Sequence, residues 1–127
     1  MPFDATVTYT NKTLDDLRIL EKARHRIRLP QLWCRGHMIK GNRLCMMGAI
    51  AYACGVSKKE LQRINSGATM GRQHEMHYDH IIAVLERYIP DFVLPDYNDD
   101  FEVTHADVIK LFDRAIADHQ QRLSVIT

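Results

Sequence analysis

Apolar residues recur at three- and four-residue spacing in three long segments of this chain. The segments are residues 13–28, 73–89 and 104–123. This spacing places apolar side chains along one side of an α-helix. Pro30 and Pro90 follow the first two segments, and proline disfavours helical geometry at the residue before it and cannot continue a helix. The pattern therefore predicts a chain that is mainly helical.

Shorter segments add helices to this framework. Residues 44–54 are an apolar run of small side chains with Gly55 after it, as expected for a buried helix that ends before a glycine. Ser57-Lys58-Lys59-Glu60 is a capping box, which predicts a short helix through about Asn65. Thr104-His105-Ala106-Asp107 is an approximate capping box with Asp in the last position, so we expect the final helix to begin there.

Four segments are predicted to be irregular or extended. Residues 1–10 alternate weakly between apolar and polar types, which favours an extended N-terminal arm or one short strand. Residues 31–43 are expected to form a loop or, as the alternative, a small hairpin around residues 36–44 with its turn at Gly41-Asn42. Residues 91–103 are expected to form a loop. The last helix is expected to fray, so residues 118–127 form a loosely held C-terminus.

Size and composition predict one compact domain spanning residues 1–127, mainly α, with four to five helices. A chain of 127 residues is too short for two ordinary domains, and it has 46% apolar and 26% charged residues, as soluble globular proteins do. No apolar run approaches the roughly 20 residues that span a bilayer. The start of the chain lacks the basic and apolar regions of a signal peptide, and three cysteines cannot all pair with one another. We therefore expect a cytoplasmic protein without a membrane partner.

The net charge of +1 hides a strong separation of charge along the chain. Residues 22–59 contain nine Lys and Arg and no Asp or Glu, whereas residues 75–107 contain nine acidic residues and Arg87 as the single base. Two interpretations follow. Either the two stretches face each other and neutralise within the fold, or the basic stretch stays exposed and attracts phosphates or an acidic partner.

The exposed alternative defines a candidate partner-binding face. Its residues are Arg24, Arg26, Arg28, Trp33, Arg35, Lys40 and Arg43. Arginine and lysine suit contacts with phosphate, and an indole can stack on a base or a guanidinium. A core position is the stronger expectation for Trp33, because a large aromatic ring is usually buried. No helix-turn-helix, RNA-binding or phosphate-loop pattern accompanies these residues.

Scarce residue types gather in residues 33–55, which hold the only tryptophan, all three cysteines and four of the six glycines. Cys45 stands at the expected start of a helix, where free amides and the helix dipole can lower a thiol pKa and activate a nucleophile. A cysteine hydrolase would also need a base such as His37, His77 or His105, brought close by the fold. The favoured interpretation is a small buried thiol.

Two groups of residues resemble metal ligands. Cys34-x-x-His37 precedes Cys45 and Cys54, but a second two-ligand knuckle is missing, and Cys45 and Cys54 point about 180° apart on one helix. His74 and His77 are three residues apart and are weak candidates for sharing an ion, with His80 expected in solvent. We expect no metal and no cofactor.

The order of several residues resembles an uncharacterised family of small bacterial and phage proteins. The shared order is Trp33-Cys34-x-Gly36, then Cys45-x-x-Gly48-Ala49, then Asn98-Asp99, with looser agreement further along. The resemblance covers roughly residues 14–117, and the chain departs from it in the acidic segment from Asp91 to Glu102. The family is of unknown function, so the resemblance implies a fold and a phage or mobile-element origin, and no activity.

Three functions are compatible with these observations. The leading one is a small non-enzymatic module that docks a macromolecular partner through the basic face. The second is a cysteine-dependent hydrolase or amidase that uses Cys45. The third is direct binding of nucleic acid.

Overall fold

The chain is mainly helical, as predicted. The computed structural model describes residues 5–126, with the side chains of residues 11–125. The elements are α1 (Ala5–Arg26), the short 3-10 helix η1 (Pro30–Leu32), β1 (Ile39–Lys40), β2 (Arg43–Leu44), α2 (Met46–Ala53), α3 (Lys58–Asn65), α4 (Arg72–Glu86), α5 (Leu94–Asp99) and α6 (His105–Ile126). None of these helices is long and apolar enough to cross a membrane.

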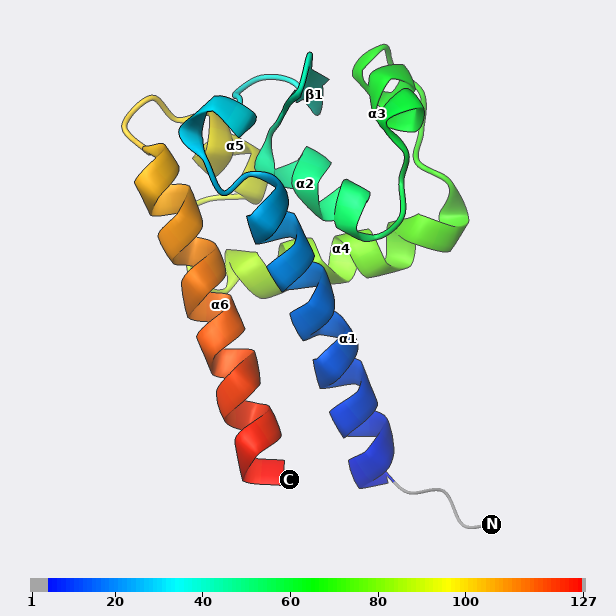
Figure 1. Ribbon diagram of the computed structural model, residues 1–127, viewed down its shortest axis with the longest axis vertical. Coiled ribbons are helices and arrows are strands. Elements are labelled where there is room, and N and C mark those ends of the chain that lie inside the picture. Colours follow the sequence, from blue (N-terminus) through cyan, green and yellow to red (C-terminus); the bar gives the residue numbers. More distant parts are fainter. Residues whose placement is uncertain (1–4, 127) are drawn as a thin grey trace.

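Two long helices, α1 and α6, lie side by side and run in opposite directions (Figure 1). Helix α4 crosses behind this pair, and the short elements gather at the end where α1 finishes and α6 begins (Figure 1). The core lies between these layers, where Leu20, Ile50 and Phe112 have no exposed surface. The long helices therefore serve as a base on which the short helices and the hairpin are held.

Helix α2 lies at the centre of the short elements, and its small residues allow close approach. Met46, Ala49, Ile50 and Ala51 are fully buried. A β-carbon at Gly48 would lie 2.0 Å from the carbonyl oxygen of Met38, so the hairpin rests directly on this glycine. A larger residue at position 48 would force the hairpin away from α2.

Most of the local predictions are confirmed. Strands β1 and β2 pair antiparallel, with Lys40 opposite Arg43, and the turn contains Gly41 with φ +61°. Ser57 Oγ accepts a hydrogen bond from the Glu60 amide at 3.2 Å, so α3 begins at the predicted capping box. Thr104 Oγ1 and the Asp107 carboxylate accept from each other's amides at 3.2 and 3.0 Å. Asp thus replaces Glu in a working capping box.

Three predictions about irregular segments are corrected. The extended arm predicted for residues 1–10 is wrong for residues 5–10, which form the first turns of α1; residues 1–4 lie outside the described residues. The loop predicted for residues 91–103 contains α5, so the described residues form six α-helices rather than four to five. Helix α6 continues to Ile126, through residues 118–126 where we expected fraying, and Thr127 lies outside the described residues.

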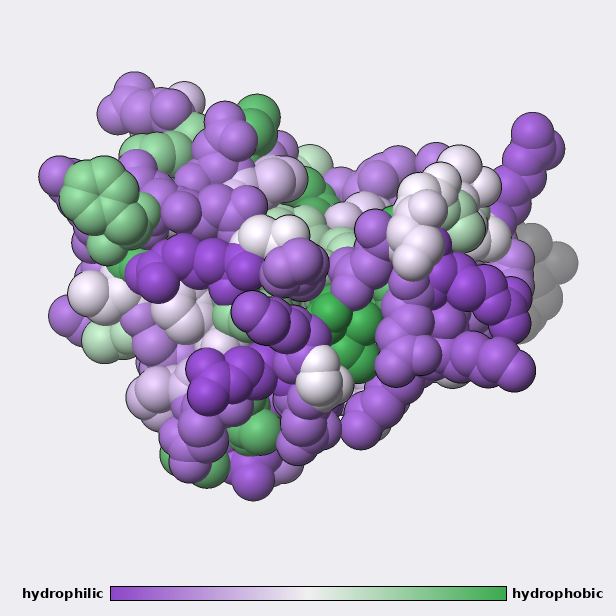
Figure 2. All heavy atoms as spheres, turned by 90° about the horizontal axis from the view of Figure 1, so that it is seen from above, coloured by the Kyte–Doolittle hydropathy of each residue, from purple (hydrophilic) through white to green (hydrophobic). Residues whose placement is uncertain are grey.

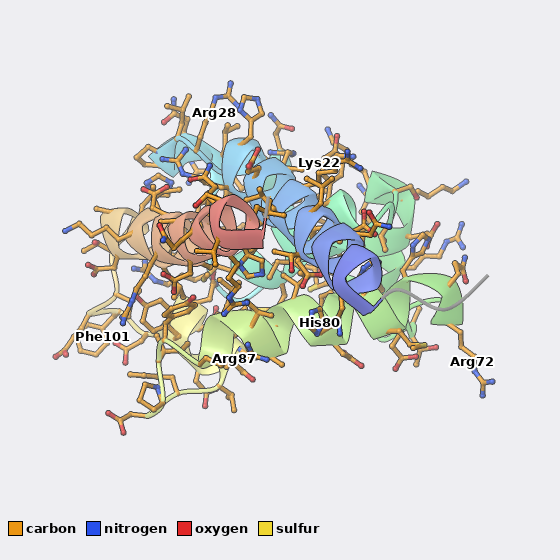
Figure 3. The ribbon with its side chains drawn as sticks, turned by 90° about the horizontal axis from the view of Figure 1, so that it is seen from below. Lys22, Arg28, Arg72, His80, Arg87 and Phe101 are labelled. Atoms are coloured by element: carbon orange, nitrogen blue, oxygen red, sulfur yellow. The ribbon has the colours of Figure 1, made fainter. Side chains whose placement is uncertain are left out.

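A buried carboxylate joins the three longest helices. Asp16 on α1 is 5% exposed, and its Oδ2 accepts a hydrogen bond from His80 Nε2 of α4 at 2.8 Å. His119 Nε2 of α6 lies 3.8 Å from the same oxygen, and the other ring nitrogen donates to the Ala115 carbonyl at 2.8 Å. Figure 3 shows His80 where α4 faces α1. His80 was predicted to lie in solvent, and this is wrong.

The Asp16 cluster predicts a loss of stability in acid. Burial raises the pKa of Asp16, but His119 and His80 outweigh burial and hold this pKa below its ordinary value. The unfolded chain therefore binds this proton more readily than the folded one. The stabilising contribution is present above the unfolded pKa of about 3.9 and is lost as the pH falls through the folded pKa, by at most about 1.4 kcal/mol per pH unit.

Urea unfolding as a function of pH measures this contribution. Asp16→Asn should be less stable than the parent protein near neutral pH and should show a shallower decline below about pH 4. Asp15→Asn is the matched control, because Asp15 is exposed on the same helix. Parallel acid profiles for the parent protein and Asp16→Asn would contradict the prediction.

Candidate anion-binding face

Asn98 organises the end of the molecule that carries the hairpin. Its side chain is fully buried, and its Oδ1 accepts hydrogen bonds from Trp33 Nε1 at 2.8 Å and from the Met46 amide at 3.0 Å. Its Nδ2 donates to the Cys34 carbonyl at 3.2 Å and to Asp99 Oδ1 at 2.9 Å. The amide group thus uses all four of its hydrogen-bonding positions. It ties α5 to the start of α2 and to the loop that holds Trp33.

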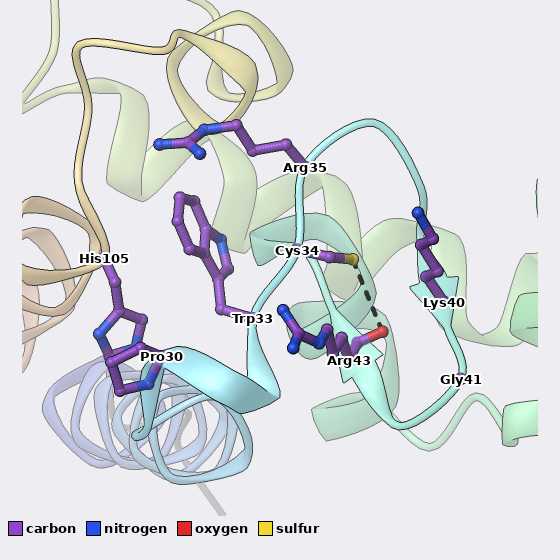
Figure 4. Close-up of a pocket in the computed structure, with 8 residues that line it drawn as sticks. All are labelled: Pro30, Trp33, Cys34, Arg35, Lys40, Gly41, Arg43 and His105. Atoms are coloured by element: carbon purple, nitrogen blue, oxygen red, sulfur yellow. Dashed lines mark hydrogen bonds between the residues drawn. The ribbon is translucent and has the colours of Figure 1, made fainter.

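The first basic hollow lies beside this loop and has a volume of about 660 Å³. We call it the Trp33 hollow; its walls are Pro30, Trp33, Cys34, Arg35, Lys40, Gly41, Arg43 and His105. Figure 4 shows the Arg35 side chain lying along the indole and the Arg43 guanidinium pointing toward Trp33. The Arg35 guanidinium carbon is 4.6 Å from the centre of the Trp33 ring, and the His105 ring is 5.9 Å from it.

The second basic hollow lies on the other side of the hairpin turn and has a volume of about 440 Å³. We call it the Tyr52 hollow; its walls are Lys22, His25, Arg26, Arg28, Leu32, Asn42, Tyr52 and Lys58. The two hollows share a boundary, because Gly41 lines one and its neighbour Asn42 lines the other. Together they form what we call the basic face.

Four cations of the basic face are held in place by neutral acceptors. Arg26 donates to the Asn42 carbonyl and side-chain oxygens at 3.0 and 3.2 Å, and Lys58 Nζ donates to the same side-chain oxygen at 3.2 Å. Arg28 donates to the His25 carbonyl at 3.0 Å, and Arg35 donates to the Val103 carbonyl. A carbonyl orients a cation without cancelling its charge. These four side chains are therefore oriented without being paired to an acid among the described residues.

The predicted neutralisation between the basic and acidic stretches is not made by ion pairs. Among the described residues, no salt bridge joins a base of residues 22–59 to an acid of residues 75–107. Arg24 is the exception within the predicted partner-binding set. Its Nε lies 2.5 Å from Asp113 Oδ1 on α6, and it lines neither hollow. The other six predicted residues all line the basic face.

Trp33 lies in the core, which confirms the stronger of the two expectations for this residue. Its side chain is 7% exposed and its nitrogen is bound to Asn98. The guanidinium of Arg35 covers the ring, so the predicted stacking partner is a residue of this same chain. The indole is therefore a wall that fixes Arg35, and little of it is left to receive a base.

Cys45 stands at the predicted helix start, but its environment is that of a structural thiol. It is the N-cap residue of α2, and its Sγ accepts a hydrogen bond from the Gly48 amide at 3.2 Å. The side chain is 2% exposed, and burial raises the pKa of Cys45 to about 12. Desolvation outweighs the helix start, so the thiol stays protonated near neutral pH.

The proposed bases for Cys45 make no hydrogen bond to it among the described residues. His37 is exposed and lines a small hollow of about 310 Å³ that Cys45 also borders. His105 lies in the Trp33 hollow and donates from Nε2 to the Ile27 carbonyl at 2.7 Å. His77 is exposed on α4. The geometry of a thiol–imidazole pair is therefore not formed here.

The candidate metal ligands are engaged elsewhere or lie apart. Within the described part of the chain, no three His, Cys, Asp or Glu side chains form a group able to hold an ion. Cys34 Sγ is 3.5 Å from the His37 carbonyl and 3.6 Å from the Arg43 carbonyl, so the thiol contacts backbone. His74 donates from Nδ1 to the Cys54 carbonyl at 2.9 Å, while His77 is exposed.

The structure adds residues to the site that the sequence did not indicate. Lys58 lines the Tyr52 hollow together with Lys22, and Asn42 orients its cations. Lys22 lies two positions before Arg24, so its place beside Arg26 and Arg28 follows from the sequence, whereas Lys58 lies 36 positions further along and shares no local pattern with it. Asn98 is indicated only by the resemblance, in which it forms a pair with Asp99.

Comparison with known proteins identifies the family of this chain. The model of a family described as "Family of unknown function (DUF6197)" matches residues 11–118, and the chain belongs to that family. No curated protein and no solved structure matches the chain. The family places no activity on any residue, so function has to be argued from the site described above.

Replacing Asn98 should loosen the basic face from within. Asn98→Ala leaves the Trp33 Nε1–H, the Met46 amide and the Cys34 carbonyl buried without their partner, and each such group costs about 1–3 kcal/mol. We expect a loss of at least about 3 kcal/mol in urea unfolding and a red shift of fluorescence from Trp33, the only tryptophan. Asn11→Ala, at an exposed position of α1, should change neither quantity; an equally mild effect at both positions would contradict the role of Asn98.

Thiol alkylation tests the environment of Cys45. In the folded protein, iodoacetamide should modify Cys45 slowly and only at strongly alkaline pH, because the thiol is buried and its pKa is raised to about 12. Cys54 is the internal comparison, since it is half-buried with a pKa raised to about 11 and should react sooner. Mass spectrometry resolves the two sites. Rapid alkylation of Cys45 at an apparent pKa near or below about 8.5 would show an activated thiol instead.

Proposed function

We propose that the protein, a member of this family of unknown function, is a small non-enzymatic binding module. It docks a negatively charged macromolecular partner through the basic face. One observation carries the proposal: two adjoining hollows are walled by Lys, Arg and His, and no acidic residue lines either of them. Cations that line a hollow without acidic neighbours raise the local concentration of an anionic partner and orient its approach.

The arrangement of the cations favours binding over catalysis. Arg26 and Lys58 converge on Asn42, and Arg28 and Arg35 are bound to backbone carbonyls. Because these side chains are already oriented, less conformational entropy is lost when an anion binds. The one candidate nucleophile, Cys45, is buried and points to no activated base. Such a module would act in the cytoplasm, where its three free cysteines stay reduced.

Charge reversal on the basic face tests this proposal. Arg28→Glu with Arg43→Glu places one acid in each hollow, and both parent side chains are exposed. Immobilised protein should capture its partner from a lysate of the native host at low salt, and this double variant should lose the capture by at least about tenfold. Eluates are analysed for both protein and nucleic acid.

The matched control is Arg72→Glu with Arg87→Glu, which changes the net charge by the same amount. Figure 3 shows Arg72, at the start of α4, and Arg87, directly after its end, on the side of the molecule away from Lys22 and Arg28. The control should capture the partner as the parent protein does. Equal capture by all three proteins would remove the basic face from the function.

A further inference from the structure

The basic face carries information about the chemistry of its partner, beyond the sign of the charge. We infer that the two hollows bind the phosphates of a double-stranded nucleic acid, without reading its sequence. The inference rests on the proposed function and deepens it by naming the ligand. Three features of the molecule support it: the type of cation, the state of the aromatic rings, and the position of the exposed apolar residues.

The first feature is the type of cation. Four arginines line the two hollows: Arg26 and Arg28 in one, Arg35 and Arg43 in the other. A guanidinium has five donors in a planar fork that matches the oxygens of phosphate. The bonds to Asn42, His25 and Val103 use one or two of these donors and leave the others for a ligand. Two hollows that adjoin across one turn suit a ligand that repeats its phosphates along a backbone.

The second feature is the state of the Trp33 and Tyr52 rings, which are covered by cations of this chain. Arg35 lies 4.6 Å from the Trp33 ring centre, and Lys22 Nζ lies 5.4 Å from the Tyr52 ring centre. Proteins that bind single strands stack bases on aromatic side chains, which need a free ring face. A cation of the chain already lies over each of these two rings, so neither is a ready platform for a base. A duplex, whose bases stay stacked inside, needs only backbone contacts.

The third feature, the position of the exposed apolar residues, disfavours an acidic protein as the partner. Stable protein interfaces are depleted of charge at their centre and depend on apolar or aromatic anchors that enter pockets. Among the side chains that the structure describes, the large exposed apolar ones line neither hollow: Phe101 is 85% exposed and Met76 is 83% exposed. Figure 3 shows Phe101 projecting on a different side from Arg28, and Figure 2 shows the hairpin end as mostly hydrophilic with apolar groups in separate patches. A charged centre without apolar anchors is typical of nucleic-acid contacts.

The acidic segment limits how a duplex can lie. Asp99 Oδ1 accepts a hydrogen bond from the Gly36 amide at 2.8 Å, so the end of α5 contacts the residue that follows Arg35, a wall of the Trp33 hollow. The carboxylates of this segment repel phosphate and keep the ligand over the hairpin turn. This explains how a chain with a net charge of only +1 can still present a defined cationic site.

Fluorescence anisotropy with short labelled duplexes tests the inference. The parent protein should bind two duplexes of unrelated sequence with equal affinity, and at least as tightly as the single strands. Affinity should fall steeply between about 50 and 200 mM salt, with a logarithmic slope of about 0.9 for each phosphate neutralised. DNA and RNA duplexes are separate arms, and either one binding in this way supports the inference and identifies the ligand.

Three double variants locate the contacts. Lys40→Gln with Arg43→Gln removes two charges from the Trp33 hollow, and Lys22→Gln with Arg28→Gln removes two from the Tyr52 hollow. Each should reduce the salt slope by about 2 and weaken binding at least tenfold. Arg72→Gln with Arg87→Gln is the charge-matched control and should retain both slope and affinity. Unchanged Trp33 fluorescence and urea midpoints show that each variant is folded.

Three outcomes would overturn the inference. The first is the absence of duplex binding at the lowest salt. The second is an equal loss in the hollow variants and in the control, which would reflect net charge alone. The third is a partner captured from nuclease-treated lysate that still depends on the hollows. That result identifies the partner as an acidic protein and still supports the proposed function. If partner capture does not depend on the hollows at all, both the proposed function and the inference are wrong.

Discussion

The buried side chain of Asn98 is the constraint on which the basic end of the molecule depends. Its four hydrogen bonds join α5, the start of α2 and the loop of residues 33–36. These segments are separated by up to 65 positions in the chain, and regular secondary structure does not hold them together. Burying a polar group costs free energy unless the group is hydrogen-bonded. The network therefore stabilises one arrangement of these segments and disfavours arrangements that leave its polar groups unpaired. Trp33 is oriented by it, and Arg35 is oriented by Trp33.

A second buried polar contact organises the opposite half. Asp16 and its neighbours His80 and His119 connect α1, α4 and α6 around one carboxylate. The apolar faces of these helices supply the free energy of burial, but apolar contacts are not directional. The Asp16 carboxylate adds directional contacts that fix where the three helices meet. The base formed by the long helices is thereby kept in register with the short elements that it supports.

The molecule separates structural chemistry from surface chemistry. The residues that look reactive in the sequence are used inside the fold: Cys45 caps α2, Cys34 contacts backbone carbonyls, and His80 holds Asp16. The cations are left at the surface, where carbonyls and rings orient them without neutralising them. Within the predicted partner-binding set, only Arg24 forms an ion pair, and its partner is Asp113. A reactive residue type in a crowded segment is therefore weak evidence for catalysis until its burial is known.

The sequence by itself determined the helices, their caps and the hairpin, because periodicity, proline and the Ser57 and Thr104 boxes act over a few neighbouring residues. It also determined that basic and acidic residues occupy different stretches. It failed at residues 5–10, where the weak alternation of types favoured an extended chain, and at α5, where acidic residues and Pro95 resembled a loop. Only the tertiary structure decided which cations share a hollow, that Trp33 is covered, and that Cys45 is desolvated. Those outcomes depend on contacts such as Trp33 with Asn98 and Lys58 with Asn42, and contacts between distant residues leave no spacing in the sequence from which to predict them.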